Sequence, residues 1–122
     1  MESLIKILNR TVAKFESAFE GIYAGIRYDR SILIQVLIAF MSIGVFLFLK
    51  ISRVEWLFVI SAIFVVLITE FLNSAVEDIC DLLIKNYDLH VKEIKDIAAG
   101  AVLIAAMYAV VVAVVILSGR IL

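Results

Sequence analysis

The sequence predicts an all-α membrane protein, in which one amphipathic surface helix is followed by three transmembrane helices. Of its 122 residues, 65% are hydrophobic, and the mean hydropathy is +1.14. Soluble domains are usually about 45–50% apolar, and small domains bury the smallest fraction of their surface. The chain has no proline, so long helices can continue without a break. We therefore expect a single membrane domain over residues 1–122.

The N-terminal segment, about residues 3–27, has the pattern of an amphipathic helix. Apolar residues recur at spacings of three and four, which places them on one helix face. They are Leu8, Val12, Phe15, Phe19, Ile22 and Ile26. Charged side chains share the remaining surface, as is typical of a helix that lies in the membrane interface. Packing of the same face on partner helices is the alternative interpretation.

Three apolar stretches follow, and a bilayer span needs about 20 residues. The middle stretch begins at Trp56, a typical interfacial anchor, but its uncharged run ends at Thr69 and is too short to cross. This span must therefore continue through Glu70. The third stretch is rich in alanine, which allows close helix packing in membranes. We expect the spans at about 31–50, 56–76 and 97–118.

The remaining segment, about residues 77–96, is polar and is expected to form a loop on the same side as the N-terminal helix. Together these two segments carry eight Lys and Arg residues, five before the first span and three in the loop. The opposite side carries three: Lys50, Arg53 and Arg120. The positive-inside rule therefore places the N-terminus and the loop in the cytoplasm.

Four polar residues stand at helical spacing where the second span meets the loop: Glu70, Asn73, Glu77 and Asp81. At about 100° per residue they fall within a stripe of roughly 80° on one helix face. A charge at the depth of Glu70 costs at least about 2.5–3.5 kcal/mol, and such residues usually mark function. A polar helix end that merges into a loop would explain Glu77 and Asp81, but not Glu70.

These carboxylates and a nearby lysine are suited to a magnesium–polyphosphate complex. Mg²⁺ takes one or two carboxylates and completes its coordination with water and phosphate oxygens, and Lys95 offers a charge for phosphate. Taken alone, Asp96 is better interpreted as the N-cap of the third span, and His90 as a solvated loop residue. The familiar nucleotide-binding and kinase motifs are absent from the sequence. A net charge of −1 gives no basic field for nucleic acid.

Two motifs at this spacing resemble the signature of prokaryotic diacylglycerol kinases and undecaprenol kinases. The first is Glu70-Phe-Leu-Asn73-Ser-Ala-Val-Glu77, followed by Asp81, and the second is Lys95-Asp96-Ile-Ala-Ala-Gly-Ala-Val-Leu. The resemblance covers nearly the whole chain. It implies a homotrimeric bundle in the inner (cytoplasmic) membrane, with active sites between subunits at the membrane surface. It also implies transfer of the γ-phosphoryl group of Mg·ATP to a lipid hydroxyl.

The resemblance also assigns roles to individual residues. It implies that Glu70 is the general base and contacts the lipid, that Asn73 supports it, and that Glu77 binds Mg²⁺ and the nucleotide. It places Lys95 and Asp96 at the nucleotide, Arg10 near both ATP and lipid, and Asp81 in a supporting position. Asp29 stands where the family usually has a second metal-binding glutamate that also faces the nucleotide. Some positions depart from the family pattern: Asp29 is shorter, Gln35 replaces an acid, Ser17 replaces an aromatic residue, and residues 86–88 differ.

The lipid acceptor is either undecaprenol or diacylglycerol, which both present a primary hydroxyl on an apolar tail. The stretch from Ile51 to Phe58 and the run from Lys95 to Leu103 resemble the Gram-positive undecaprenol kinases, which favours undecaprenol. A small proton-coupled transporter that uses Glu70 as its proton site is the alternative function, and it predicts a fourth span. A purely structural membrane subunit is a third possibility.

Overall fold

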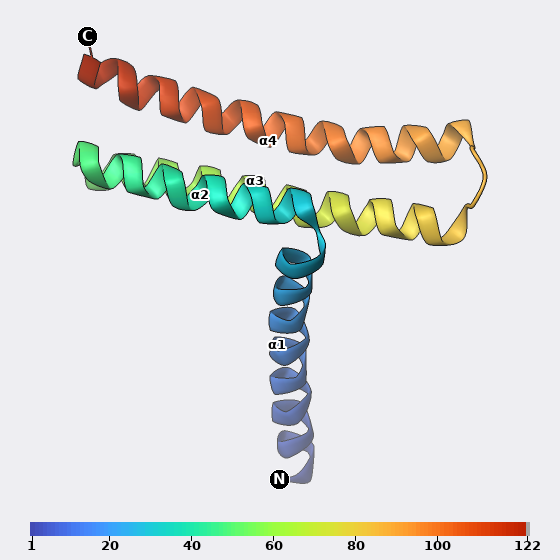
Figure 1. Ribbon diagram of the computed structural model, residues 1–122. Helices are drawn as coiled ribbons and strands as arrows, with labels where there is room; N and C mark the ends of the chain where they lie inside the picture. Colours follow the sequence, from blue (N-terminus) through green and yellow to red (C-terminus); the bar gives the residue numbers. More distant parts are fainter. Residues whose placement is uncertain (122) are drawn as a thin grey trace.

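The computed structural model describes residues 1–121, which form four helices joined by short connections (Figure 1). They are α1 (Glu2–Tyr28), α2 (Arg30–Leu49), α3 (Arg53–Leu83) and α4 (Leu89–Ile121). The last three are long and apolar enough to cross a membrane, and the described residues contain no strand. The predicted fold class is therefore confirmed.

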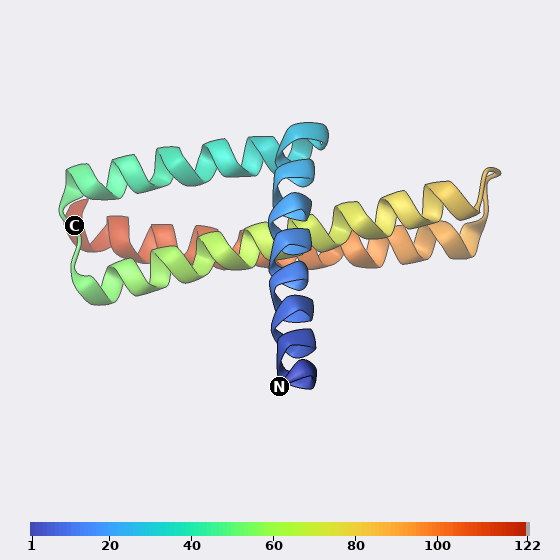
Figure 2. The same cartoon turned by 90° about the horizontal axis from the view of Figure 1, so that it is seen from below.

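Helix α1 runs across the direction of the other three helices (Figures 1 and 2). None of its residues is buried, and its apolar face, which includes Leu8, Phe15 and Phe19, is exposed. A helix that crosses the spans and leaves an apolar face uncovered has the geometry expected at a membrane interface.

Asp29 alone joins α1 to α2 and closes both helices. Its backbone N–H donates to the carbonyl of Gly25 at 3.0 Å, and its Oδ1 accepts from the N–H of Ile32 at 3.1 Å. Aspartate is among the preferred N-cap residues because its carboxylate satisfies an N–H that has no partner inside the helix. With only one connecting residue, the chain changes direction sharply here, and α1 passes over α3. A methyl group added at Gly25 would overlap the ring of Phe71.

The connection between α2 and α3 lies at the opposite end of the molecule. Lys50 adopts the left-handed conformation that ends α2, and Ser52 begins α3 with a reciprocal capping box to Glu55. Glu55 also accepts two hydrogen bonds from Arg120 at 2.6 Å, which fixes the end of α4 to the start of α3. These bonds lower the pKa of Glu55 to about 2.

Helices α3 and α4 lie side by side and form the α3–α4 hairpin (Figure 2). Buried residues lie three, seven or eight positions apart on α3 and four or seven apart on α4, close to the heptad spacing of an antiparallel coiled coil. They are Val59, Ala62, Glu70, Asn73 and Cys80 on α3, and Ala105, Val112 and Ile116 on α4. We call this line of buried residues the seam of the hairpin. At Glu70 and Asn73 it changes from apolar to polar residues.

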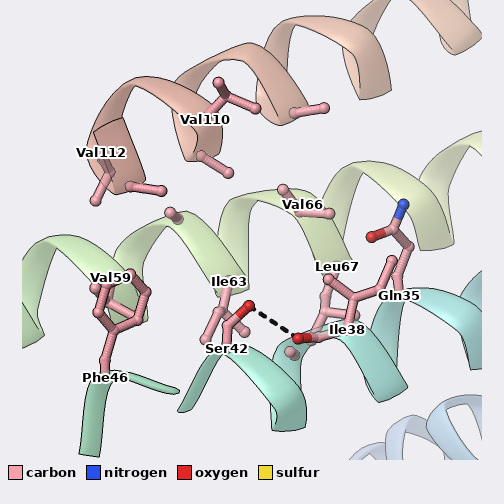
Figure 3. Close-up of a pocket in the computed structure, with 15 residues that line it drawn as sticks. Gln35, Ile38, Ser42, Phe46, Val59, Ile63, Val66, Leu67, Val110 and Val112 are labelled. Carbon is pink, nitrogen blue, oxygen red and sulfur yellow. Dashed lines mark hydrogen bonds between the residues drawn. The ribbon is translucent and has the colours of Figure 1, made fainter. Parts of the chain in front are cut away.

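Helix α2 packs on α3 and leaves an apolar groove of about 320 Å³ between α2, α3 and α4. Figure 3 shows Phe46 and Val59 at one end of this groove and Gln35 at the other. Ser42 also lines it, and its hydroxyl donates to the carbonyl of Ile38 at 2.9 Å. The groove passes Leu67, about one turn of α3 from Glu70.

The polar segment 77–96 is not the long loop that its composition suggests. Helix α3 continues to Leu83 and α4 begins at Leu89, so only residues 84–88 connect them. Cys80 stays buried in the seam, which explains why α3 continues beyond the apolar stretch. The hairpin consequently extends past α1 on the side away from α2 (Figure 2).

The start of α4 also corrects the expected N-cap. Asp96 lies inside the helix, whereas Asp88 accepts a hydrogen bond from the N–H of Val91 at 3.0 Å. Asp88 therefore caps the helix. His90 is exposed, as expected, but it lies in the first turn of α4 and not in a loop.

Candidate active site at the polar end of the hairpin

Three of the predicted residues follow one another on successive turns of α3. Glu70 and Asn73 are buried, with 6% and 9% of their surface exposed, and Glu77 is half-buried. The amide Nδ2 of Asn73 donates to Oε1 of Glu77 at 3.2 Å. The Oδ1 atom of Asn73 is buried and has no hydrogen-bond partner among residues 1–121. Because the Glu70 carboxylate and the Asn73 amide are buried, these residues do not form a solvated helix end.

Asp29 joins this group from the α1–α2 connection. Its carboxylate and that of Glu77 both interact electrostatically with Glu70, so three acidic groups from two parts of the chain converge. One oxygen of Asp29 is engaged in capping α2. The predicted proximity of Asp29 to the α3 stripe therefore depends on the sharp connection that follows α1.

A second groove, of about 410 Å³, lies beside these carboxylates where α1 crosses α3. Asp29 and Tyr28 line it from the α1–α2 connection, and Phe71, Ser74 and Asp78 line it from α3. Ser74 and Asp78 are functional candidates that sequence reasoning missed. Neither residue belongs to the stripe through Glu70, so the sequence pattern did not indicate them. Their place in the groove depends on the crossing of α1 over α3.

The residues present fit a single hydrated divalent cation better than a fully protein-coordinated one. Among the described residues, no three His, Cys, Asp or Glu side chains are close enough to hold a metal together. Mg²⁺ often uses only one or two carboxylates and keeps several waters. Glu77 offers such a carboxylate, and the free Oδ1 of Asn73 offers an acceptor beside it.

Lys95 and Asp96 lie on the first turns of α4, before its uncharged stretch, and both are paired. Lys95 reaches across the hairpin to Asp81, with 2.7 Å between Nζ and Oδ1. Asp96 accepts from Nζ of Lys92, one turn earlier, at 2.6 Å. The hydrogen bond to Asp81 raises the pKa of Lys95, so the cation stays charged at neutral pH. The supporting role predicted for Asp81 thus takes the form of an ion pair.

Arg10 does not join the site within one chain. It is separated from Gly25, where α1 crosses α3, by 15 residues of continuous helix, or about 22 Å at 1.5 Å per residue. Its side chain is exposed. The N-terminal part of α1 extends away from the hairpin (Figure 1).

Three spanning helices, a crossing surface helix and one buried acidic group beside two half-buried ones define an integral membrane protein with a polar site. The sequence matches the family model of prokaryotic diacylglycerol kinase over residues 16–117. The chain therefore belongs to this family of membrane lipid kinases, which confirms the resemblance. The matched range contains every predicted site residue except Arg10. A comparison with curated proteins gives no match for the chain.

Proposed function

We propose that the protein is an ATP-dependent kinase that phosphorylates the hydroxyl of a membrane lipid, with undecaprenol favoured over diacylglycerol. The observation that carries this proposal is the order of polar groups along α3. Glu70 is buried nearest the apolar stretch, and Glu77 lies about 10 Å further along the axis at 1.5 Å per residue. A lipid hydroxyl stays near the headgroups, whereas ATP cannot enter the hydrocarbon, so the two substrates need groups at two depths.

In this mechanism Glu70 accepts the proton of the lipid hydroxyl, whose oxygen attacks the γ-phosphorus while the bond to the ADP oxygen breaks. Glu77 holds Mg²⁺ on the nucleotide, and Asp29 contributes a second carboxylate. When bound, Mg²⁺ neutralises charge on the phosphates. Lys95 and Asp96 contact the nucleotide, for which they exchange their present partners Asp81 and Lys92.

The distance of Arg10 from the other groups supports a site shared between subunits. If Arg10 contacts ATP and lipid, it does so on a neighbouring chain, as in the homotrimer that the family resemblance implies. The positive-inside rule supports an orientation in which this end faces the cytoplasm from the inner membrane. The transporter alternative loses support, because it predicted a fourth span and the described residues contain three.

The function is tested with purified protein in lipid or detergent, given Mg·ATP and equal amounts of undecaprenol and diacylglycerol. Radiolabelled phosphate should appear in one or both lipids, mainly in undecaprenol, and the ratio of products identifies the acceptor. The Glu70→Gln variant should assemble normally and lose turnover by at least about 10²–10⁴-fold, the usual contribution of general base catalysis. Absence of labelled lipid with both acceptors would refute the kinase function.

A further inference from the structure

Among the described side chains, Oδ1 of Asn73 is the one fully buried nitrogen or oxygen atom that has no hydrogen-bond partner. The Nδ2 atom of the same amide donates to Oε1 of Glu77. An ionised carboxylate can only accept hydrogen bonds, so Glu77 dictates which end of the amide faces it. Oδ1 of Asn73 is then the end of the amide that faces away from the Glu77 carboxylate, although the two side chains are neighbours.

This arrangement costs free energy, since a buried acceptor without a donor loses its hydration and gains nothing in return. An apolar residue at this position of the seam would avoid the cost of the unpaired acceptor. Apart from Glu70, the other seam positions on α3, Val59, Ala62 and Cys80, carry apolar residues. An apolar side chain at position 73 would continue the seam, so the amide must serve something other than the packing of α3 on α4.

We propose that Asn73 is a positioning residue for the divalent cation. Its Nδ2 orients the Glu77 carboxylate, and its Oδ1 accepts a hydrogen bond from the hydration shell of the cation. Groups that hydrogen-bond a metal ligand commonly alter metal affinity when they are removed. The inference deepens the proposed function and rests on Glu77 as the carboxylate that holds Mg²⁺. It also changes the expected role of Asn73, which acts through Glu77 and not through Glu70.

The test measures cation binding without turnover. Full-length protein in liposomes, with a non-hydrolysable ATP analogue, is titrated with Mn²⁺ as the probe, and free Mn²⁺ is read by electron paramagnetic resonance. Asn73→Ala and Asn73→Leu should each weaken Mn²⁺ binding by about 10-fold or more. Ser61→Ala removes a polar side chain from the same helix about two dozen ångströms from Glu77, at 1.5 Å per residue, and should leave Mn²⁺ affinity unchanged.

Asn73→Leu separates this role from a structural one. Leucine has the same number and branching of side-chain heavy atoms as asparagine and suits the apolar seam, so the variant should unfold at the same temperature as wild type or a higher one. Weaker Mn²⁺ binding in a protein of undiminished stability is the expected result. Wild-type Mn²⁺ affinity in both Asn73 variants, or no Mn²⁺ binding by the wild type, would overturn the proposal.

Double variants identify the group through which Asn73 acts. In a Glu77→Gln background, Asn73→Ala should change the remaining Mn²⁺ affinity by less than about twofold, because interacting residues are not additive. In a Glu70→Gln background it should keep its full effect of about 10-fold. The opposite pattern would assign Asn73 to Glu70. A failed lipid phosphorylation assay would reject the kinase function alone, since the Mn²⁺ titration needs no turnover.

Discussion

At the scale of single residues, the carboxylate of Asp29 has two roles. One oxygen caps α2 through the N–H of Ile32, and the charge as a whole interacts with Glu70. A glutamate would place its carboxylate about one bond further from the backbone, beyond the geometry of an N-cap, which prefers short side chains. The shorter aspartate at this position can therefore cap α2 and also place a negative charge near Glu70.

Asp29→Asn separates the two roles, because asparagine caps a helix as well as aspartate does but carries no charge. We expect this variant to keep the stability of the wild type and to lose turnover. Asp29→Ala should lose turnover and also about 1 kcal/mol of stability through the missing cap. Thermal unfolding and the lipid phosphorylation assay measure the two effects. Full turnover in Asp29→Asn would show that Asp29 is only a cap.

At the scale of helices, the contact of α1 with α3 determines where the surface helix sits. Gly25 lies against the ring of Phe71, and no larger residue fits there unless one of them moves. Because Asp29 follows one turn later, a displacement of α1 at this crossing would also move the carboxylate relative to Glu70.

Gly25→Val should therefore reduce turnover several-fold by separating α1 from α3. Phe71→Ala creates space at the same point, so the double variant should recover part of the lost turnover. Gly21→Ala is the matched control. Position 21 lies on the same helix with nothing nearby, so alanine there should stabilise α1 by up to about 1 kcal/mol and leave turnover intact. Equal losses in Gly25→Val and Gly21→Ala would contradict the crossing argument.

A second helix contact, between Glu55 and Arg120, closes the other end of the hairpin. The pKa of Glu55 is lowered from 4.5 to about 2, mainly by the hydrogen bonds from Arg120. For a carboxylate with a lowered folded-state pKa, the stabilisation is complete above the unfolded value and disappears as the pH falls through the folded value. It should therefore be present above pH 4.5 and be lost progressively towards pH 2.

Glu55→Gln tests this contact without removing the helix cap, because glutamine also serves in a capping box. We expect its unfolding temperature to be lower than that of wild type at pH 7 and the difference to shrink as the pH falls from 4.5 towards 2. Differential scanning calorimetry in detergent measures both. A difference independent of pH over this range would show that the ion pair does not stabilise the hairpin.

At the scale of the whole molecule, one chain holds an incomplete set of the proposed groups. Asp29, Glu70, Asn73 and Glu77 converge, whereas Arg10 lies about 22 Å along α1 from the crossing at 1.5 Å per residue. A continuous helix cannot fold back to shorten this distance. The proposed chemistry therefore requires an assembly in which α1 of one chain reaches the hairpin of another.

Mixing two inactive variants tests this requirement. Arg10→Ala and Glu70→Gln should each lose turnover alone, but a mixed assembly contains some sites with an intact Arg10 from one chain and an intact Glu70 from another. We therefore expect activity to return when the two variants are reconstituted together, and not when they are assayed in separate vesicles. No recovery in the mixed sample, with subunit exchange verified by crosslinking, would place both residues on one chain.

Much of this arrangement followed from the sequence, because hydrophobic periodicity and charge act locally. The three spans and the amphipathic pattern of α1 are visible as uncharged runs and spacings. The depth of Glu70 followed from a span too short without it, and its burial agrees. The segment 77–96 was predicted wrongly because its many charges suggest a loop. The seam residue Cys80 keeps it helical, and capping falls to Asp88 instead of Asp96.

What the sequence by itself determined is therefore the class of protein, the number of spans and the stripe of polar residues on the second span. Only the tertiary structure decided which of these residues meet. It brings Asp29 to Glu70 through a one-residue connection, pairs Lys95 with Asp81 across the hairpin, and leaves Arg10 distant. The physical reason is that burial and spacing act along one helix. Contacts between helices depend instead on where connections bend the chain and where a glycine leaves room for a side chain of the neighbouring helix.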